Sequence, residues 1–211
     1  VSDAVYEHES GTKIIPSSLS VKELKRLDHR KLKEIGRKLR KMSDYVIFDS
    51  AAGLGEEATA AIESADELLV VTNPEIPAVT DALKTIKLAE EMGKDVMGII
   101  VTKTNGANSE MSVSDIKDML DAPILGVVPE DKNVQASLRT RDALLYSYPY
   151  SKASIAYKRI AAKLSRSRSA RCSSITLPLM PWASKKMSAS TLLPKCGWVL
   201  TRWSTISPAS P

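Results

Sequence analysis

Three apolar segments of this sequence end in residues that could contact a phosphate, a metal ion or a nucleotide base. The first segment ends in Asp49, and small residues follow it as far as Gly53. A carboxylate in this position can hold the shell of Mg²⁺, and a glycine amide can approach a terminal phosphate because it has no Cβ. The same pattern also fits an ordinary strand end followed by a cap and a turn.

Two later segments end in residues that could lie beside a base. One ends in Thr102 and Lys103, and the aliphatic part of a lysine can lie against a ring. The other ends in Pro129, Glu130 and Asp131, where a proline could pack against a base edge. A solvated loop lysine and a helix start with acids that complement the dipole are the simpler interpretations.

The elements that would position these residues alternate between strands and helices. Apolar, β-branched runs predict strands at 13–15, 45–48, 68–72, 96–101 and 124–128. Helix-length segments at 76–92, 112–120 and 152–164 lie between or after them. The last three strands start 28 residues apart, which leaves room for parallel crossovers. The sequence predicts a doubly wound, mostly parallel α/β sheet, whose ligands would lie beyond the carboxyl ends of the strands.

Taken together, residues 49–54, 72–75 and 126–131 resemble the MinD/ParA family of deviant Walker A ATPases, and in particular its cell-division-site branch. The resemblance extends from about residue 3 to residue 164. The sequence departs from the family pattern at Ala51, where the family usually has proline, and at Thr102-Lys103, where it usually has Asn-Arg.

The resemblance implies an ATPase that binds ATP and Mg²⁺ and pairs as a homodimer across the nucleotide. It also implies a cytoplasmic protein that attaches peripherally to the inner face of the cell membrane and helps place the division septum. Asp49 would be the acid near Mg²⁺, and Gly53 would face the γ-phosphate. The base-side positions would be those of Thr102, Lys103, Pro129, Glu130 and Asp131.

The family's Gly-rich phosphate loop is absent from this sequence. No glycine is followed by lysine and then by serine or threonine. We therefore expect the chain to be the C-terminal part of a family member that begins after the loop, incomplete at its N-terminus. Without the loop we expect no ATP hydrolysis. The loss of a central strand would leave apolar strand edges unpaired, so we expect marginal stability.

Charged residues are distributed unevenly along the chain. The 211 residues have a net charge of +5, but residues 165–211 contain no acidic residue and seven basic ones. Residues 1–164 therefore have a net charge of −2. We predict a nucleotide-binding domain at 1–164 and a basic Ser/Pro/Trp tail at 165–211 that is disordered or non-native. The composition excludes a collagen-like chain or wholesale disorder, and no apolar run is long enough to span a membrane.

Two basic features leave a membrane or nucleic-acid role open. Residues 22–41 hold ten basic residues and an apolar stripe, which fits either a surface for anionic lipid or DNA or an amphipathic helix packed on the sheet. The tail has three tryptophans among its basic residues, as an interfacial anchor would, although prolines interrupt it.

Two other functions remain possible from the sequence. The chain could be a non-catalytic α/β binding or regulatory module, or it could belong to the DNA-segregating branch of the same family. Nucleic acid is the less favoured partner, because the positive net charge comes from the tail and not from the domain. The sequence does not identify a regulatory partner.

Overall fold

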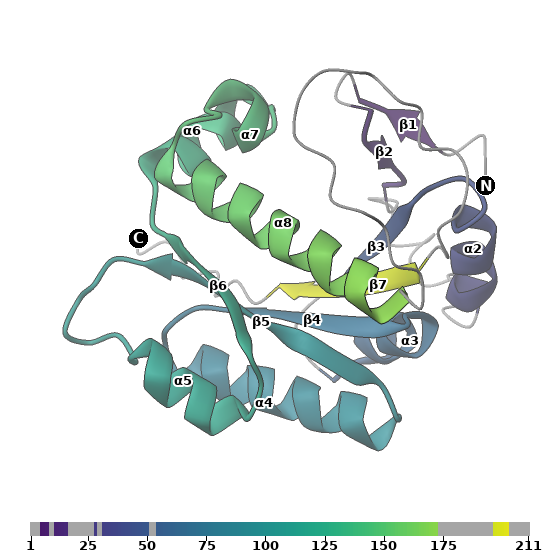
Figure 1. Ribbon diagram of the computed structural model, residues 1–211, viewed down its shortest axis with the longest axis horizontal. Coiled ribbons are helices and arrows are strands. Elements are labelled where there is room, and N and C mark those ends of the chain that lie inside the picture. The colour runs from purple at the N-terminus through teal and green to yellow at the C-terminus, as the bar shows by residue number, and fades with distance from the viewer. Residues whose placement is uncertain are drawn as a thin grey trace, which may run out of the picture.

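The fold is built around a five-stranded parallel sheet. The computed structural model describes residues 5–8, 11–16, 28, 31–50, 54–172 and 196–202. The strand order is β3-β7-β4-β5-β6, and each neighbouring pair is parallel (Figure 1). The strands are β3 (Tyr45–Ser50), β4 (Glu67–Thr72), β5 (Asp95–Thr104), β6 (Ile124–Pro129) and β7 (Cys196–Arg202).

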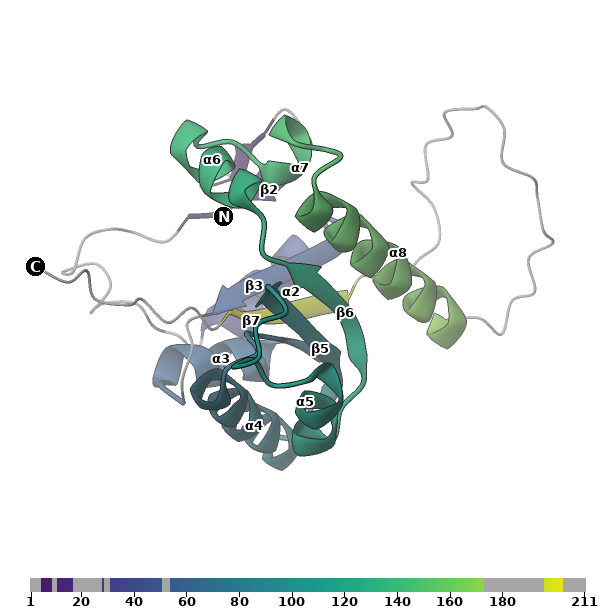
Figure 2. The same ribbon diagram turned by 90° about the vertical axis from the view of Figure 1, so that its left-hand side faces the viewer.

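Helices cover both faces of this sheet. Helices α3, α4 and α5 pack on one face, and α8 packs on the other (Figures 1 and 2). The predicted doubly wound α/β fold is therefore confirmed. The helices are α2 (Leu32–Leu39), α3 (Glu56–Ser64), α4 (Ile76–Glu91), α5 (Val113–Leu120), α6 (Lys132–Thr140), α7 (Leu144–Ser147) and α8 (Lys152–Cys172).

Alternating side chains of the central strands form two cores. In β4, Leu68 and Val70 pack under α3, α4 and α5, whereas Leu69 and Val71 face α8. All four side chains are buried. This explains why the strand reads as a continuous apolar run, since a strand covered on both faces has no solvent-facing position.

Most of the expected elements are present. The strands predicted at 45–48, 68–72, 96–101 and 124–128 are β3, β4, β5 and β6, each extended by one to four residues. The weak cap predicted for 112–120 is also real, because the Ser112 hydroxyl accepts a hydrogen bond of 3.1 Å from the Asp115 N–H. Helices α3 and α7 were not predicted from the sequence, and α6 was indicated only by the helix start at Glu130 and Asp131.

The strand predicted at 13–15 does not join the main sheet. Residues Lys13–Ile14 form β2, which pairs antiparallel with β1 (Tyr6–Glu7). Both strands of this hairpin are exposed, and Gly11 turns between them with φ +80°. Between the two strands, directly after β1, His8 lies 4.0 Å from the carboxylate of Asp142 beside α7. The segment therefore contributes a small surface hairpin, because its apolar run is too short to cross a sheet.

The basic segment 22–41 is described only in part. Lys22, Lys25, Arg26 and Arg30 lie outside the described residues. The described part contains α2, whose Leu32 packs against the core under α3 and α4 while its lysines are exposed. Over these residues the structure matches a helix packed on the domain with a solvated basic face.

Two features of the structure bear on the predicted tail. Helix α8 continues past Leu164 to Cys172, so the boundary expected there falls inside a helix. Residues 196–202 form β7, which lies between β3 and β4, where unpaired strand edges were expected. The division into a domain and a tail remains a prediction. In the described part of the chain, no helix is both long and apolar enough to cross a membrane.

Candidate functional site

The predicted site residues gather at one edge of the sheet. Strands β3, β4, β5 and β6 are parallel, so their carboxyl ends share one edge. Asp49 is the second-last residue of β3. Of the predicted base-side residues, Thr102 and Lys103 lie near the end of β5, Pro129 ends β6, and Glu130 and Asp131 follow it. This is the edge at which ligands bind in open α/β sheets.

Thr102 has a structural role at this edge. Its hydroxyl lies 3.0 Å from Oδ1 of Asn73 and 3.3 Å from the carbonyl oxygen of Thr72. Asn73 is 2% exposed and Thr72 is fully buried. A buried amide needs a partner, so Thr102 holds the end of β4 in place from the neighbouring strand β5. Any base contact by Thr102 remains a prediction.

The loop after Thr102 is held in a fixed shape by Glu110. Its carboxylate accepts hydrogen bonds from the N–H groups of Asn105, at 2.9 Å, and of Gly106, at 3.0 Å. Lys103 is exposed and has φ +58°, a left-handed backbone that is uncommon for residues other than glycine. The lysine is therefore presented to solvent from a pre-ordered loop. Sequence analysis missed Glu110; the Asn105-Gly106 turn is the signal that marks this loop.

The loops after β5 and β6 are joined to each other. The N–H of Glu130 donates to the carbonyl of Thr104 at 2.8 Å. The Asn105 side-chain amide donates to the Glu130 carboxylate at 3.4 Å. Pro129 is half-buried at the end of β6. Lys103, Pro129 and Glu130 therefore belong to one continuous surface at the carboxyl edge.

The Asp131 carboxylate accepts hydrogen bonds from the starts of two helices. One of its oxygens accepts a hydrogen bond from Asn133 N at 2.9 Å, which caps α6. The other accepts from Ala153 N at 3.1 Å, at the start of α8. These bonds, that of Asn133 first, hold the pKa of Asp131 below its ordinary value of 3.8. The simpler interpretation of this residue, a helix start, is what the structure shows, and its role beside a base remains a prediction.

Replacing Asp131 with alanine is expected to destabilise the fold by about 1–2 kcal/mol, the usual cost of a lost cap. Because its pKa is lowered, the ionised carboxylate stabilises the native state above its ordinary pKa of 3.8. That stabilisation is lost as pH falls through the folded-state value. Urea unfolding between pH 7 and pH 3 should show a smaller loss of stability on acidification for Asp131→Ala than for the parent. Equal pH dependence in the two proteins would contradict this role.

Asp49, the predicted metal-side residue, lies near the carboxyl end of β3. It is exposed and pairs in register with Leu200 of β7, which in turn pairs with Leu69 of β4. With strands about 4.8 Å apart, Asp49 is about 10 Å across the sheet from β4. Gly53 lies outside the described residues. Within the described ranges no group of three His, Cys, Asp or Glu residues could hold a metal ion. The described residues therefore fit part of a Mg²⁺ site, one carboxylate, and not a complete one.

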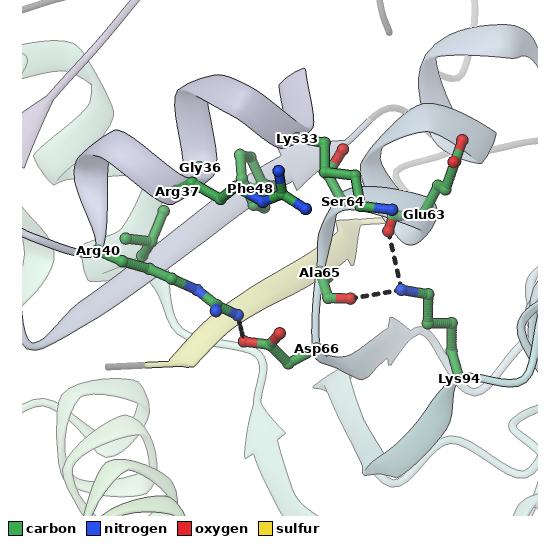
Figure 3. Close-up of a pocket in the computed structure, with 11 residues that line it drawn as sticks. Lys33, Gly36, Arg37, Arg40, Phe48, Glu63, Ser64, Ala65, Asp66 and Lys94 are labelled. Carbon is green, nitrogen blue, oxygen red and sulfur yellow. Dashed lines mark hydrogen bonds and ion pairs between the residues drawn. The ribbon is translucent and has the colours of Figure 1, made fainter. Parts of the chain in front are cut away.

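A small pocket of about 160 Å³ lies at the opposite edge of the sheet, between α2, α3 and the starts of β4 and β5 (Figure 3). Lys94 Nζ donates to the carbonyls of Glu63, at 2.8 Å, and Ala65, at 2.7 Å. Burial, and then the charge of Lys33, lowers the pKa of Lys94. Arg40 pairs with Asp66. Because two of its cations already fix the end of α3 and the start of β4, we interpret this pocket as structural.

Comparison with known proteins agrees with the fold. No family model matches the sequence. An ATP-binding protein of Methanocaldococcus jannaschii, otherwise uncharacterised, is 38% identical over 164 residues, which are 78% of this chain and 62% of that protein. The septum site-determining protein MinD of Synechocystis is 31% identical over 144 residues, 65% of this chain and 53% of that protein.

A solved structure is also similar to this chain in fold. The septum site-determining protein MinD of Pyrococcus horikoshii, complexed with Mg-ADP, superposes with a TM-score of 0.74 and 27% identity. The match covers 78% of this chain and 68% of that one. The chain spans about three fifths of the length of the curated relatives that it matches first.

Proposed function

Since this chain is a relative of MinD and of MinD-like ATP-binding proteins in both sequence and fold, we propose that it carries the base side of an adenine-nucleotide site. The observation that supports this most directly is the joined pair of loops after β5 and β6. Lys103 and Pro129 would lie against the base, and Glu130 would hold the two loops together.

The proposal gives the phosphate side a single residue, Asp49. When bound, Mg²⁺ would neutralise phosphate charge, and the exposed Asp49 carboxylate would hold its shell. The sequence has no G-x-x-x-x-G-K-[ST] loop, so nothing described here cradles the phosphates. We therefore assign no hydrolytic step to this chain.

For the complete protein we propose an ATPase of the cell-division-site type. It would pair as an ATP-dependent homodimer and act from the cytoplasm, attached peripherally to the inner face of the membrane. Similarity to an ATP-binding protein and to a septum site-determining protein supports the ATP-binding and septum-site parts of this proposal. The homodimer, the membrane attachment and the regulatory partner rest on the family resemblance alone.

Nucleotide contact is tested by titrating Mg·ATP into ¹⁵N-labelled full-length chain. We expect amide shifts at 102–106 and at Glu130 and Asp131, and weaker binding in Lys103→Gly. Glycine removes the lysine side chain but keeps the left-handed backbone at φ +58°. Lys117→Ala, an exposed lysine on α5, is the matched control and should titrate like the parent. Shifts confined to α2 and the pocket at the opposite edge would contradict the proposal.

Purified full-length chain is expected to release no phosphate from ATP above the rate in buffer. Phosphoryl transfer depends on positioning and on charge stabilisation of the phosphates, and the loop that normally supplies them is missing from the sequence. A coupled phosphate-release assay with Mg·ATP, run alongside Asp49→Asn as a check on contaminating ATPases, measures this. Turnover that Asp49→Asn abolishes would overturn the prediction.

A further inference from the structure

The last described strand, β7, occupies an interior position in the sheet. β7 pairs with β3 from Tyr45↔Cys196 to Ser50↔Thr201, and with β4 from Glu67↔Trp198 to Val71↔Arg202. Both ladders are parallel and without irregularity. Seven residues that follow all the helices in sequence thus use the backbone groups on both of their edges.

β3 depends on this strand for its place in the sheet. Among the described strands, β3 is hydrogen-bonded to β7 and to no other. Without β7, the edge of β4 that faces β3 would be unpaired in the middle of the core, where Leu68 and Val70 are 1% and 0% exposed. The space between β3 and β4 is about 10 Å, the width that one strand fills. Buried backbone N–H and C=O groups are almost always paired, and a parallel strand pairs a whole row of them with evenly spaced hydrogen bonds.

We propose that β3 and β4 form an acceptor site for one parallel extended strand, and that residues 196–202 of the same chain occupy it. The proposal is independent of nucleotide binding, because it concerns backbone pairing within the sheet.

The sequence of the tail suits this occupant. Residues 196–202 contain no proline and include Trp198, Val199 and Thr201, which favour strands. The tail carries seven basic residues and no acidic ones, whereas residues 1–164 have a net charge of −2. Opposite charges steer a tethered segment towards its site.

The connection between α8 and β7 is long enough for the strand to reach its own sheet. Residues 173–195 separate the two elements. At about 3.3 Å per residue an extended chain of this length spans about 75 Å, several times the radius of a domain of this size. A connection of this length can therefore reach the sheet of the same molecule.

Proline substitution in the full chain tests the pairing. Val199→Pro removes a backbone donor from the middle of β7 and should speed amide exchange in β3 and in β4 by about tenfold or more. Ser188→Pro, which changes the same tail outside β7, is the matched control and should leave exchange unchanged. Unaltered protection of β3 in Val199→Pro would overturn the proposal.

A cysteine pair tests the register and the source of the strand. With Cys172→Ser as background, Tyr45→Cys should form a disulfide with Cys196, its register partner. Ser50→Cys should not, because Ser50 pairs with Thr201, about 16 Å along the strand from Cys196 and beyond disulfide reach. Mass spectrometry after mild oxidation identifies the bridges. Equal bridging at both positions would overturn the register, and a bridge between two chains would overturn the intramolecular source.

Discussion

Gly98→Ala is expected to lower the free energy of unfolding by about 3 kcal/mol or more, from overpacking combined with backbone strain. A Cβ at this position would lie 2.5 Å from the carbonyl oxygen of Pro123 and 2.7 Å from Cγ of Leu125. The carbonyl cannot move aside easily, because it accepts a hydrogen bond of 2.8 Å from Ile99 N. Gly98 also has φ +151°, which residues with a Cβ rarely adopt.

The effect is large because the irregular pairing at Gly98 decides toward which face of the sheet the later side chains of β5 point. The pairing with β4 is irregular here: Leu68 pairs with Val96, and Leu69 pairs with Gly98. As a result Val96 and Ile99, three residues apart, lie in the same core. In an unbroken strand residues three apart would lie on opposite faces. Restoring regular pairing would turn the buried side chains beyond Gly98 to the wrong face.

Gly93→Ala separates the two parts of this effect. Gly93 also has positive φ, +68°, but nothing lies within 4 Å of where its Cβ would be. Alanine there should cost about 1 kcal/mol, the conformational part alone. Chemical denaturation of the parent and the two variants gives the comparison. A Gly98→Ala protein no less stable than Gly93→Ala would show that the sheet relaxes around the new methyl group.

The strands and covering helices of this fold could be predicted because their signals are local. β4 is apolar from Leu68 to Val71, and a helix-length segment follows it, so periodicity alone predicts the parallel sheet. The irregularity at Gly98 depends on what β4 and Pro123 do on either side, which a single segment does not report. A lone glycine inside an apolar run is the sequence signal for such a bulge.

The sequence could predict that the candidate site residues lie at one edge of the sheet, but the tasks of these residues could not be assigned. The positions of the strand ends were enough to predict that Lys103, Pro129 and Glu130 lie at the same edge of the sheet. They did not predict that Thr102 satisfies the buried Asn73, or that Asp131, besides capping α6, holds the start of α8. A polar residue at a strand end can contact a ligand or the protein itself, and only the packing around it distinguishes the two.

The tail shows a different limit of sequence reasoning. Its composition changes sharply after residue 164, and a composition change predicts a boundary. The pairing of residues 196–202 with β3 is a contact between residues about 150 positions apart. The only local signal for such a contact is the strand propensity of one short run. The composition of the tail, which indicates a separate segment, gives no sign of the pairing.

Gly126 and Ile160 should be coupled, because β6 and α8 meet closely at this point. A Cβ on Gly126 would lie 2.3 Å from Cγ1 and 2.7 Å from Cδ1 of Ile160, which is buried in the core under α8. Gly126→Ala is therefore expected to destabilise the protein by about 2 kcal/mol through overpacking. Ile160→Ala is expected to cost about 3 kcal/mol through the cavity it leaves.

The double variant Gly126→Ala/Ile160→Ala should be less destabilised than the sum of the single variants, by about 1–2 kcal/mol, because the new methyl group enters the space that isoleucine vacates. Urea unfolding of the four proteins completes the cycle. Val79→Ala, buried in the core on the other face of the sheet, is the control partner and should add independently to Gly126→Ala. Additive losses for Gly126 and Ile160 would mean that α8 shifts to accommodate the methyl group, and that its contact with β6 is looser than these distances indicate.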